Sequence, residues 1–546
     1  MSEVLIIKLS HCNPMASTPV KPAEFYTRKA SGFVRQLSGK DMVVYNLLYM
    51  GNMWPFIYIV FGPALFPGVN FPLTVVIATP IVAVMAFAYY FFMAAMPRSG
   101  GDYVWVSRSI GPLIAFAESF VLMMIMIQFI GVLGGWAIDP AFRGIVIVWA
   151  ILSNNPGLTT AVNAFLTPWN EFVLTSVVVV ITCLVTALSV SAIRKFMWGC
   201  FIVGMIGLID YWGVMLAMGH DGFVARFNAL SGSNYAAIIQ SAQSGGYFMG
   251  FALSATFLGT IYAFQNFFGF AWNGYMGGEV KDVTRSQAVG TFGSTLILGA
   301  ITWVTYEVAY VVAGSDFIHS LSFLVGAGTN PLPMPVPYQG YLVVFATSNP
   351  ILALLPGIGF MAGCFGVVVS ILLMVTRAMF AWSFDRILPA RISELDQRFH
   401  APRNALIVLF VVGMAFAYLY FNTTLLNYLT YGSLGIWAPQ ILVGLAAAIF
   451  PYRRKDIFEK APKVVQSKLG GVPWMTIFGV FTMLAAVFNT VIAVLPVYTG
   501  APVNPYYLLA FLATAVAGPV IYTGAYLYNR RIGVDMGTAF RELPPA

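Results

Sequence analysis

Long apolar runs recur along the whole chain and are separated by short polar stretches. A helix that crosses a bilayer needs about 20 mostly apolar residues, and twelve runs have that length. The pattern therefore predicts an all-α integral membrane protein with twelve transmembrane helices. Their expected ranges are 42–66, 71–96, 111–137, 170–191, 196–218, 247–277, 288–314, 350–380, 404–421, 425–451, 473–497 and 504–528.

One further apolar run, at 144–151, is too short to cross a bilayer. Eight residues at about 1.5 Å each reach about 12 Å, whereas the hydrocarbon core is about 30 Å thick. We expect a short helix on the outer surface here.

The basic residues support this count and give an orientation. With the N-terminus inside, all 28 Lys and Arg residues except Arg143 and Arg226 fall on the cytoplasmic side. Such an excess of positive charge is typical of cytoplasmic loops. The distribution predicts a multi-pass protein of the cell membrane with a cytoplasmic N-terminal tail (1–41) and a cytoplasmic C-terminal tail (529–546) around one transmembrane domain (42–528).

Composition excludes several classes of protein. Hydrophobic residues make up 59% and charged residues 9% of the chain, against roughly 25% charged in soluble domains. The net charge of +8 then reflects topology and faces anionic lipid, so we expect the bilayer as a partner and no nucleic acid. The four Cys and four His are widely spaced, which indicates no disulfide framework, and we expect no metal and no cofactor.

Helices 1 and 6 carry residues that interrupt a helix in mid-membrane. Helix 1 contains YMGNMWP at 49–55 and FGP at 61–63, and helix 6 contains QNFFGFAWNG at 265–274. Close helix packing by small residues and a proline kink are the simpler explanation for one such helix. Two interruptions five helices apart instead match the broken helices of inverted repeats, which mark the substrate site of secondary transporters. Half-helix N-termini offer free N–H groups to an anion such as a carboxylate.

Three polar stretches carry a recognisable pattern: PRSGGDYVWVSRSIGP at 97–112, GFAWNGYMGGEVKDVTRSQAV at 269–289 and TRAMFAWSFDRILP at 376–389. In this order and helix placement, the chain resembles the amino acid–polyamine–organocation permease family. The resemblance implies the leucine-transporter-like fold, a 5+5 inverted repeat with helices 1 and 6 broken. The repeats would cover about 42–218 and 247–451, with two extra helices at 473–528.

The resemblance also implies a substrate site at the two breaks. Backbone N–H groups in helix 1 would hold a substrate carboxylate, and carbonyls in helix 6 would take its ammonium. The residues at these positions are Met50, Gly51, Asn52 and Met53 in helix 1 and Phe267, Phe268 and Gly269 in helix 6, with Gln265, Phe268 and Trp272 lining or covering the pocket. Many relatives have an acidic residue where this chain has Ala271, and its absence argues against a dicationic substrate bound in the familiar way.

Opposed charges in the three stretches form a candidate inner gate, since they can pair when the gate is shut and separate when it opens. They are Asp102, Arg108, Glu279, Lys281, Arg285, Arg377 and Asp385. The alternative is that any of them only fixes the topology.

Three acids fall within predicted spans: Glu118, Asp210 and Glu307. An ionisable group at the centre of a span costs about 2.5–3.5 kcal/mol on insertion scales, so each is a candidate for ion coupling unless it lies at a helix end or in a wet vestibule. The stretch of helix 8 at 360–375 has Ser370 as its only hydroxyl, whereas sodium-coupled relatives have two adjacent hydroxyls there. We therefore expect a proton rather than sodium as the coupling ion, or an exchanger.

Together these patterns predict a secondary active transporter, not an enzyme, that carries amino acids or related amines by alternating access. No catalytic constellation and no phosphate-binding loop is found in the sequence. A receptor or sensor with a permease-like fold, and a polyamine transporter, remain the alternatives.

Overall fold

The computed structural model describes residues 35–396, 401–423, 432–495 and 505–540. Most of the predicted N-terminal tail, the start of predicted helix 10 and the 496–504 segment lie outside these residues. Helices make up almost all of the regular structure; the strands found here are β1 (Lys468–Leu469) and β2 (Val472–Pro473), which pair as a small antiparallel hairpin.

Within the described residues, ten helices are long and apolar enough to cross a membrane, and the pair α1 (Gly39–Met50) and α2 (Pro55–Leu65), bent by 40°, makes an eleventh candidate. The predicted sixth span contains α11 (Leu253–Phe267), which has 15 residues and ends at a break. Twelve spans therefore stay a prediction. The long helices are α3 (Phe71–Ala95), α5 (Pro112–Gly135), α8 (Pro168–Thr186), α9 (Val190–Leu230), α12 (Val283–Ala309), α14 (Pro350–Phe384), α15 (Arg403–Asn422), α17 (Gly432–Arg453), α20 (Trp474–Val494) and α22 (Pro505–Arg531).

Glycine kinks mark the ends of two predicted spans. Predicted helix 5 stops at 218, and α9 kinks at Gly219, where φ is 68°. Predicted helix 7 stops at 314, and the π-helical stretch η3 (Tyr310–Gly314) joins α12 to α13 (Ser315–Gly326) with φ 90° at Gly314. Both positions need a backbone conformation that glycine adopts without steric cost.

The short apolar run forms α6 (Arg143–Leu152), a helix of ten residues. It follows α5 through the π-helical stretch η1 (Ala137–Phe142), and a kink at Asp139 separates the two helices. The chain then returns through α7 (Pro156–Phe165) to α8.

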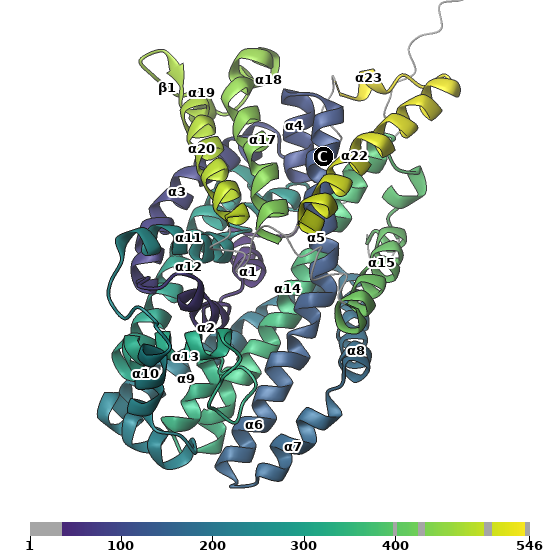
Figure 1. The fold of residues 1–546 in the computed structure, drawn as a ribbon. Helices are drawn as coiled ribbons and strands as arrows, with labels where there is room; N and C mark the ends of the chain where they lie inside the picture. Colours follow the sequence, from purple (N-terminus) through teal and green to yellow (C-terminus); the bar gives the residue numbers. More distant parts are fainter. Residues whose placement is uncertain (1–34, 397–400, 424–431, 496–504, 541–546) are drawn as a thin grey trace, which may run out of the picture.

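Figure 1 shows the loop elements at opposite ends of the bundle. α4 (Gly101–Ser109), α18 (Lys455–Phe458), α19 (Lys463–Gln466) and α23 (Met536–Ala539) lie at one end, called here the α4 end, which the sequence predicts to be cytoplasmic. α6, α7 and α10 (Tyr235–Ser244) lie at the other end, called here the α6 end.

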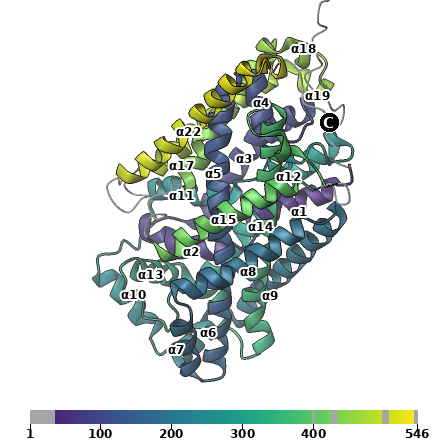
Figure 2. The ribbon, with the colours of Figure 1, turned by 90° about the vertical axis from the view of Figure 1, so that its right-hand side faces the viewer.

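α14 is the central helix of the bundle. It packs on α9, α5, α1 and α8, and 78% of the residues in its most apolar stretch are buried. α8, α15 and α22 lie on one side of the bundle (Figure 2), and only 11% of the residues in the most apolar stretch of α22 are buried. Exposed apolar side chains on these helices include Leu184, Val411 and Val520. Such a surface suits contact with lipid tails, because the backbone polar groups of a helix already form hydrogen bonds within the helix.

Candidate functional site

The break in the first span separates α1 from α2 over residues 51–54. Gly51 ends α1 with φ 72°, and its N–H still bonds to the Leu47 carbonyl. Pro55 is the first residue of α2, where its missing N–H costs nothing. The sequence thus stops one helix and starts another inside the apolar run, as predicted.

The second break follows α11, which ends at Phe267. Gly269 has φ 108°, and a 3₁₀ turn, η2 (Trp272–Tyr275), follows. A Cβ atom at Gly269 would lie 2.1 Å from Cδ1 of Tyr49. Two features therefore require glycine at position 269: its own backbone conformation and the close approach of Tyr49 from the first span.

Asn266 joins the two breaks. With its amide nitrogen toward the first span, Asn266 donates to the carbonyls of Met50 (3.2 Å) and Gly51 (3.3 Å) and accepts from the Thr302 hydroxyl (2.9 Å). This side chain is 1% exposed. A residue absent from the predicted site therefore ties the end of α1 to α11 and α12, beside both breaks.

Several backbone groups of the breaks have no partner among the described residues. In the first break, the N–H groups of Asn52 and Met53 make no hydrogen bond there. In the second, the Phe267 and Gly269 carbonyls accept from Phe270 and Trp272, whereas no donor reaches the Phe268 carbonyl. Unpaired N–H groups attract an anion, so the breaks offer donors and an acceptor in one region.

A cavity of about 410 Å³ lies at these breaks, between spans 1, 3, 6, 9 and 10. Of the predicted substrate-binding residues, Met50, Gln265 and Phe268 line it. The other six predicted residues lie at the breaks but do not line the cavity: Gly51, Asn52, Met53, Phe267, Gly269 and Trp272. Residues not predicted from the sequence make up most of the wall: Tyr49, Trp54, Tyr58, Phe129, Val132, Leu133, Trp136, Tyr262, Tyr420, Gly432 and Ser433.

The wall of this cavity is aromatic and carries no charged side chain among the described residues. Its polar side chains include Gln265, whose amide oxygen accepts from the Ser433 hydroxyl at 3.1 Å. Aromatic faces bind apolar groups and attract cations. The cavity therefore suits a ligand with one small charged head and an uncharged body.

Aromatic and amide layers separate the cavity from the α4 end. Tyr49 packs on Trp272 with ring centroids 4.0 Å apart, and Phe268 packs on Trp272 at 4.2 Å. Next to these rings, Asn46 donates to the Phe270 carbonyl (2.8 Å) and accepts from the Asn273 backbone N–H (3.0 Å). These contacts fix α1 against the segment that follows α11.

Two buried ion pairs close the α4 end. Arg377 on α14 donates to both carboxylate oxygens of Glu279 at 2.8 and 3.1 Å, and Arg108 on α4 donates to both of Asp385 at 2.6 and 2.9 Å. The side chains of all four are at most 3% exposed. Bidentate pairs of this kind are strong and directional.

The other predicted gate residues behave differently. Asp102 accepts from the Tyr275 hydroxyl and from the Tyr103 backbone N–H rather than from a basic side chain. Lys281 and Arg285 are exposed and form no ion pair with any residue that the structure describes.

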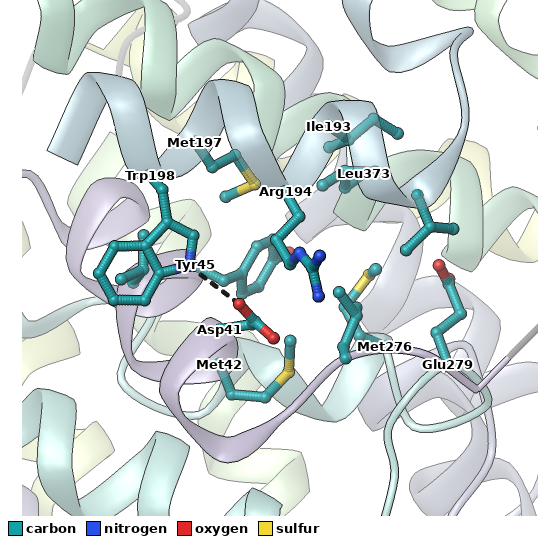
Figure 3. Close-up of a pocket in the computed structure, with 13 residues that line it drawn as sticks. Asp41, Met42, Tyr45, Ile193, Arg194, Met197, Trp198, Met276, Glu279 and Leu373 are labelled. Atoms are coloured by element: carbon teal, nitrogen blue, oxygen red, sulfur yellow. Dashed lines mark hydrogen bonds between the residues drawn. The ribbon is translucent and has the colours of Figure 1, made fainter.

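A much smaller cavity of about 30 Å³ opens at the α4 end between α1, α9 and α14. Figure 3 shows Asp41, Tyr45 and Arg194 directed into it, with Trp198 donating to the Asp41 carboxylate at 2.9 Å. The Tyr45 hydroxyl reaches the Ser370 carbonyl at 3.2 Å and separates this cavity from the deeper part of the bundle. Glu279, which pairs with Arg377, also lines this smaller cavity.

The sequence profile of the family described as amino acid permease matches residues 43–516. The chain belongs to this family. The match covers most of the 546 residues, including both broken helices, and the family is one of transporters. Comparison with the curated proteins found no match.

The three acids in the spans of this permease lie in different surroundings. Glu118 on α5 is 3% exposed, whereas Asp210 on α9 and Glu307 on α12 are half-buried. Neither oxygen of Glu118 has a hydrogen-bond partner, nor does Oδ2 of Asp210. Among the described residues of the permease, no group of three or more His, Cys, Asp or Glu side chains is placed to hold a metal ion.

Proposed function

We propose that this permease is a secondary active transporter that carries amino acids across the cell membrane by alternating access. The observation that carries the proposal is the cavity at the two breaks. Phe268, whose carbonyl has no donor among the described residues, lines it, and the unbonded N–H groups of Asn52 and Met53 lie in the break between two other wall residues, Met50 and Trp54. An α-carboxylate matches the donors, and an α-ammonium matches the carbonyl. Packed layers on the α4 side support a state in which the site is closed toward the predicted cytoplasm.

The cavity favours amino acids with uncharged side chains. A lysine side chain or a polyamine would bring a second ammonium among aromatic groups, with no carboxylate in the described wall to neutralise it. Burying an unpaired charge costs several kcal/mol, on the order of the binding energy itself. Neutral aliphatic or aromatic amino acids avoid this cost and bury apolar surface against Trp54, Trp136 and Phe268.

Transport in proteoliposomes tests this proposal. Uptake of labelled leucine, phenylalanine, lysine, glutamate and putrescine is measured in sodium-free buffer, with an inward proton gradient and, separately, with unlabelled substrate trapped inside. We expect leucine or phenylalanine to accumulate or exchange, and empty liposomes to show neither. Accumulation of putrescine alone would show that the substrate class is wrong, and absence of both activities for the whole panel would refute the transporter.

A further inference from the structure

Two carboxyl groups meet at the α4 end outside the ion pairs described above. Asp102 on α4 and Glu118 on α5 are 2% and 3% exposed, and their carboxyl groups lie within hydrogen-bonding reach of each other. Two ionised carboxylates at such a distance repel each other and lose their hydration. The pair therefore holds at least one proton, which the two groups share.

The charges nearby do not neutralise this pair. Arg108, on the same helix as Asp102, directs its guanidinium to Asp385, and Arg377 on α14 directs its guanidinium to Glu279. No basic side chain in the described part of the chain bonds to Asp102 or Glu118.

The remaining titratable groups around the pair are tyrosines. Tyr275, after α11, donates its hydroxyl to Asp102. Tyr89 on α3 lies close enough to interact electrostatically with both carboxyls, but its hydroxyl donates to Gln440 on α17. Tyr103 on α4 gives its backbone N–H to Asp102 and its hydroxyl to Asp385.

Hydrogen-bond accounting places the proton on Glu118. Asp102 already accepts from the Tyr275 hydroxyl and the Tyr103 N–H, as an ionised carboxylate does. No donor reaches either oxygen of Glu118, and a buried polar group without a partner costs about 1–3 kcal/mol. A protonated Glu118 removes this cost because its O–H donates to Asp102. Burial also raises the pKa of Asp102 above that of an exposed aspartate.

We propose that Asp102 and Glu118 form a proton-binding site, and that the proton they share is the one coupled to transport. The coupling half of this inference rests on the proposed function; the proton site itself does not. When the α4 end opens, the O–H bond of Glu118 breaks, the proton passes to water as hydronium, and the pair changes from one negative charge to two. Reprotonation reverses the step.

The position of the site links it to opening. Tyr275 belongs to the segment after α11 that also carries Glu279, and Asp102 shares α4 with Arg108. Opening the α4 end separates these elements, which lets water reach the pair. A proton that binds more tightly in the closed state favours closure by the same free energy, so proton release and opening are coupled.

Infrared spectroscopy on the purified full-length protein tests the proton site without any substrate. We expect a carbonyl stretching band of a protonated carboxyl group at neutral pH that disappears in E118Q and persists in D456N. Asp456 is a matched control because it is 60% exposed and paired with Arg454 at the same end. In D102N the band should lose its intensity at a lower pH than in the wild type, because the opposing charge is gone. A band unchanged in E118Q, or one with the same midpoint in D102N and wild type, overturns the site.

Proteoliposomes test the coupling, using the amino acid that accumulates best in the uptake panel. We expect E118Q to exchange this substrate but to lose at least tenfold of its accumulation under a proton gradient. Equal accumulation by E118Q and wild type overturns the coupling role. If the wild type shows the Glu118 band but no gradient-driven uptake, the proposed proton coupling fails while the proton site stands.

Discussion

Replacing Glu279 by Gln tests whether the buried ion pair at the α4 end holds that end shut. The Glu279 carboxylate accepts two hydrogen bonds from Arg377, and their side chains are 1% and 3% exposed. Gln keeps the shape and one acceptor oxygen but removes the negative charge from beside a buried guanidinium. The closed state should therefore lose stability relative to an open state in which Arg377 contacts water.

The structure sets the size of this effect. Removing one partner of a buried pair costs about 3–5 kcal/mol, and the oxygen that Gln retains places E279Q at about 3 kcal/mol. Because about 1.4 kcal/mol corresponds to a factor of ten, the ratio of open to closed protein should rise about 100-fold. The exposed pair of Arg454 and Asp456 should contribute less than about 1 kcal/mol.

A cysteine at Ser370 reports the opening. Ser370 is fully buried beneath Tyr45, between the small cavity and the deeper bundle. In a protein whose native cysteines are replaced, S370C should react with a water-soluble maleimide about 100-fold faster when E279Q is also present. D456N should leave the rate unchanged.

A double variant completes this test. Replacing both partners, in E279M with R377M, removes the charge imbalance and should return the labelling rate toward that of the parent, because a matched apolar pair avoids the buried charge. The reasoning is refuted if E279Q labels no faster than the parent, or if the double variant labels faster than E279Q.

Two further changes test the breaks. In G269A, φ of 108° and a Cβ 2.1 Å from Tyr49 should together cost about 2–4 kcal/mol and reduce initial uptake at least tenfold. G213A is the control, since nothing lies within 4 Å of its new methyl group, and equal uptake by both variants would contradict the site assignment. N266A leaves the Met50 and Gly51 carbonyls without this donor. We expect the variant to lose about 1–3 kcal/mol of stability, seen as a lower midpoint in a thermal melt, and to show slower uptake. An unchanged midpoint would show that Asn266 does not hold the breaks together.

The sequence predicted the breaks well because local chemistry decides them. Gly51, Pro55 and Gly269 stop or start a helix through their own backbone properties, and the structure breaks the chain at these residues. The ends of two spans near Gly219 and Gly314 were predictable for the same reason. Family membership, which rests on the same loop and helix patterns, is confirmed.

The wall of the cavity was not predictable in the same way. Tyr49, Trp54, Trp136 and Tyr262 stand in apolar runs with many other aromatic residues, and each run reads as a transmembrane helix whichever face is turned inward. Which aromatic residues face the cavity depends on the rotation of each helix against its neighbours, and residue spacing within one helix does not contain that information. Asn266 stood beside predicted site residues, but its partners lie on other spans.

Charge pairing shows the same limit from another side. The sequence predicted a set of opposed gate charges in three polar stretches, including Asp102, Arg108 and Asp385, but not which of them pair. Tertiary structure instead brings Asp385 to Arg108 and Glu118 to Asp102. The sequence located the acids, but only the fold shows that Asp385 is paired with a cation while Asp102 and Glu118 meet without one.

The closed α4 end has an energetic consequence for transport. In the proposed transport cycle, opening this end requires the aromatic, amide and ion-pair layers to separate, so we expect opening to have an unfavourable free energy unless a ligand changes it. A ligand shifts such an equilibrium only by the difference in its affinity for the two states. Asn266 ties the carbonyls of Met50 and Gly51 to α11, and the first layer begins at the adjacent residue, Tyr49, which packs on Trp272. In the proposed cycle, we therefore expect a substrate that reorders the break to act on the first layer, and proton release from Glu118 to act on the last.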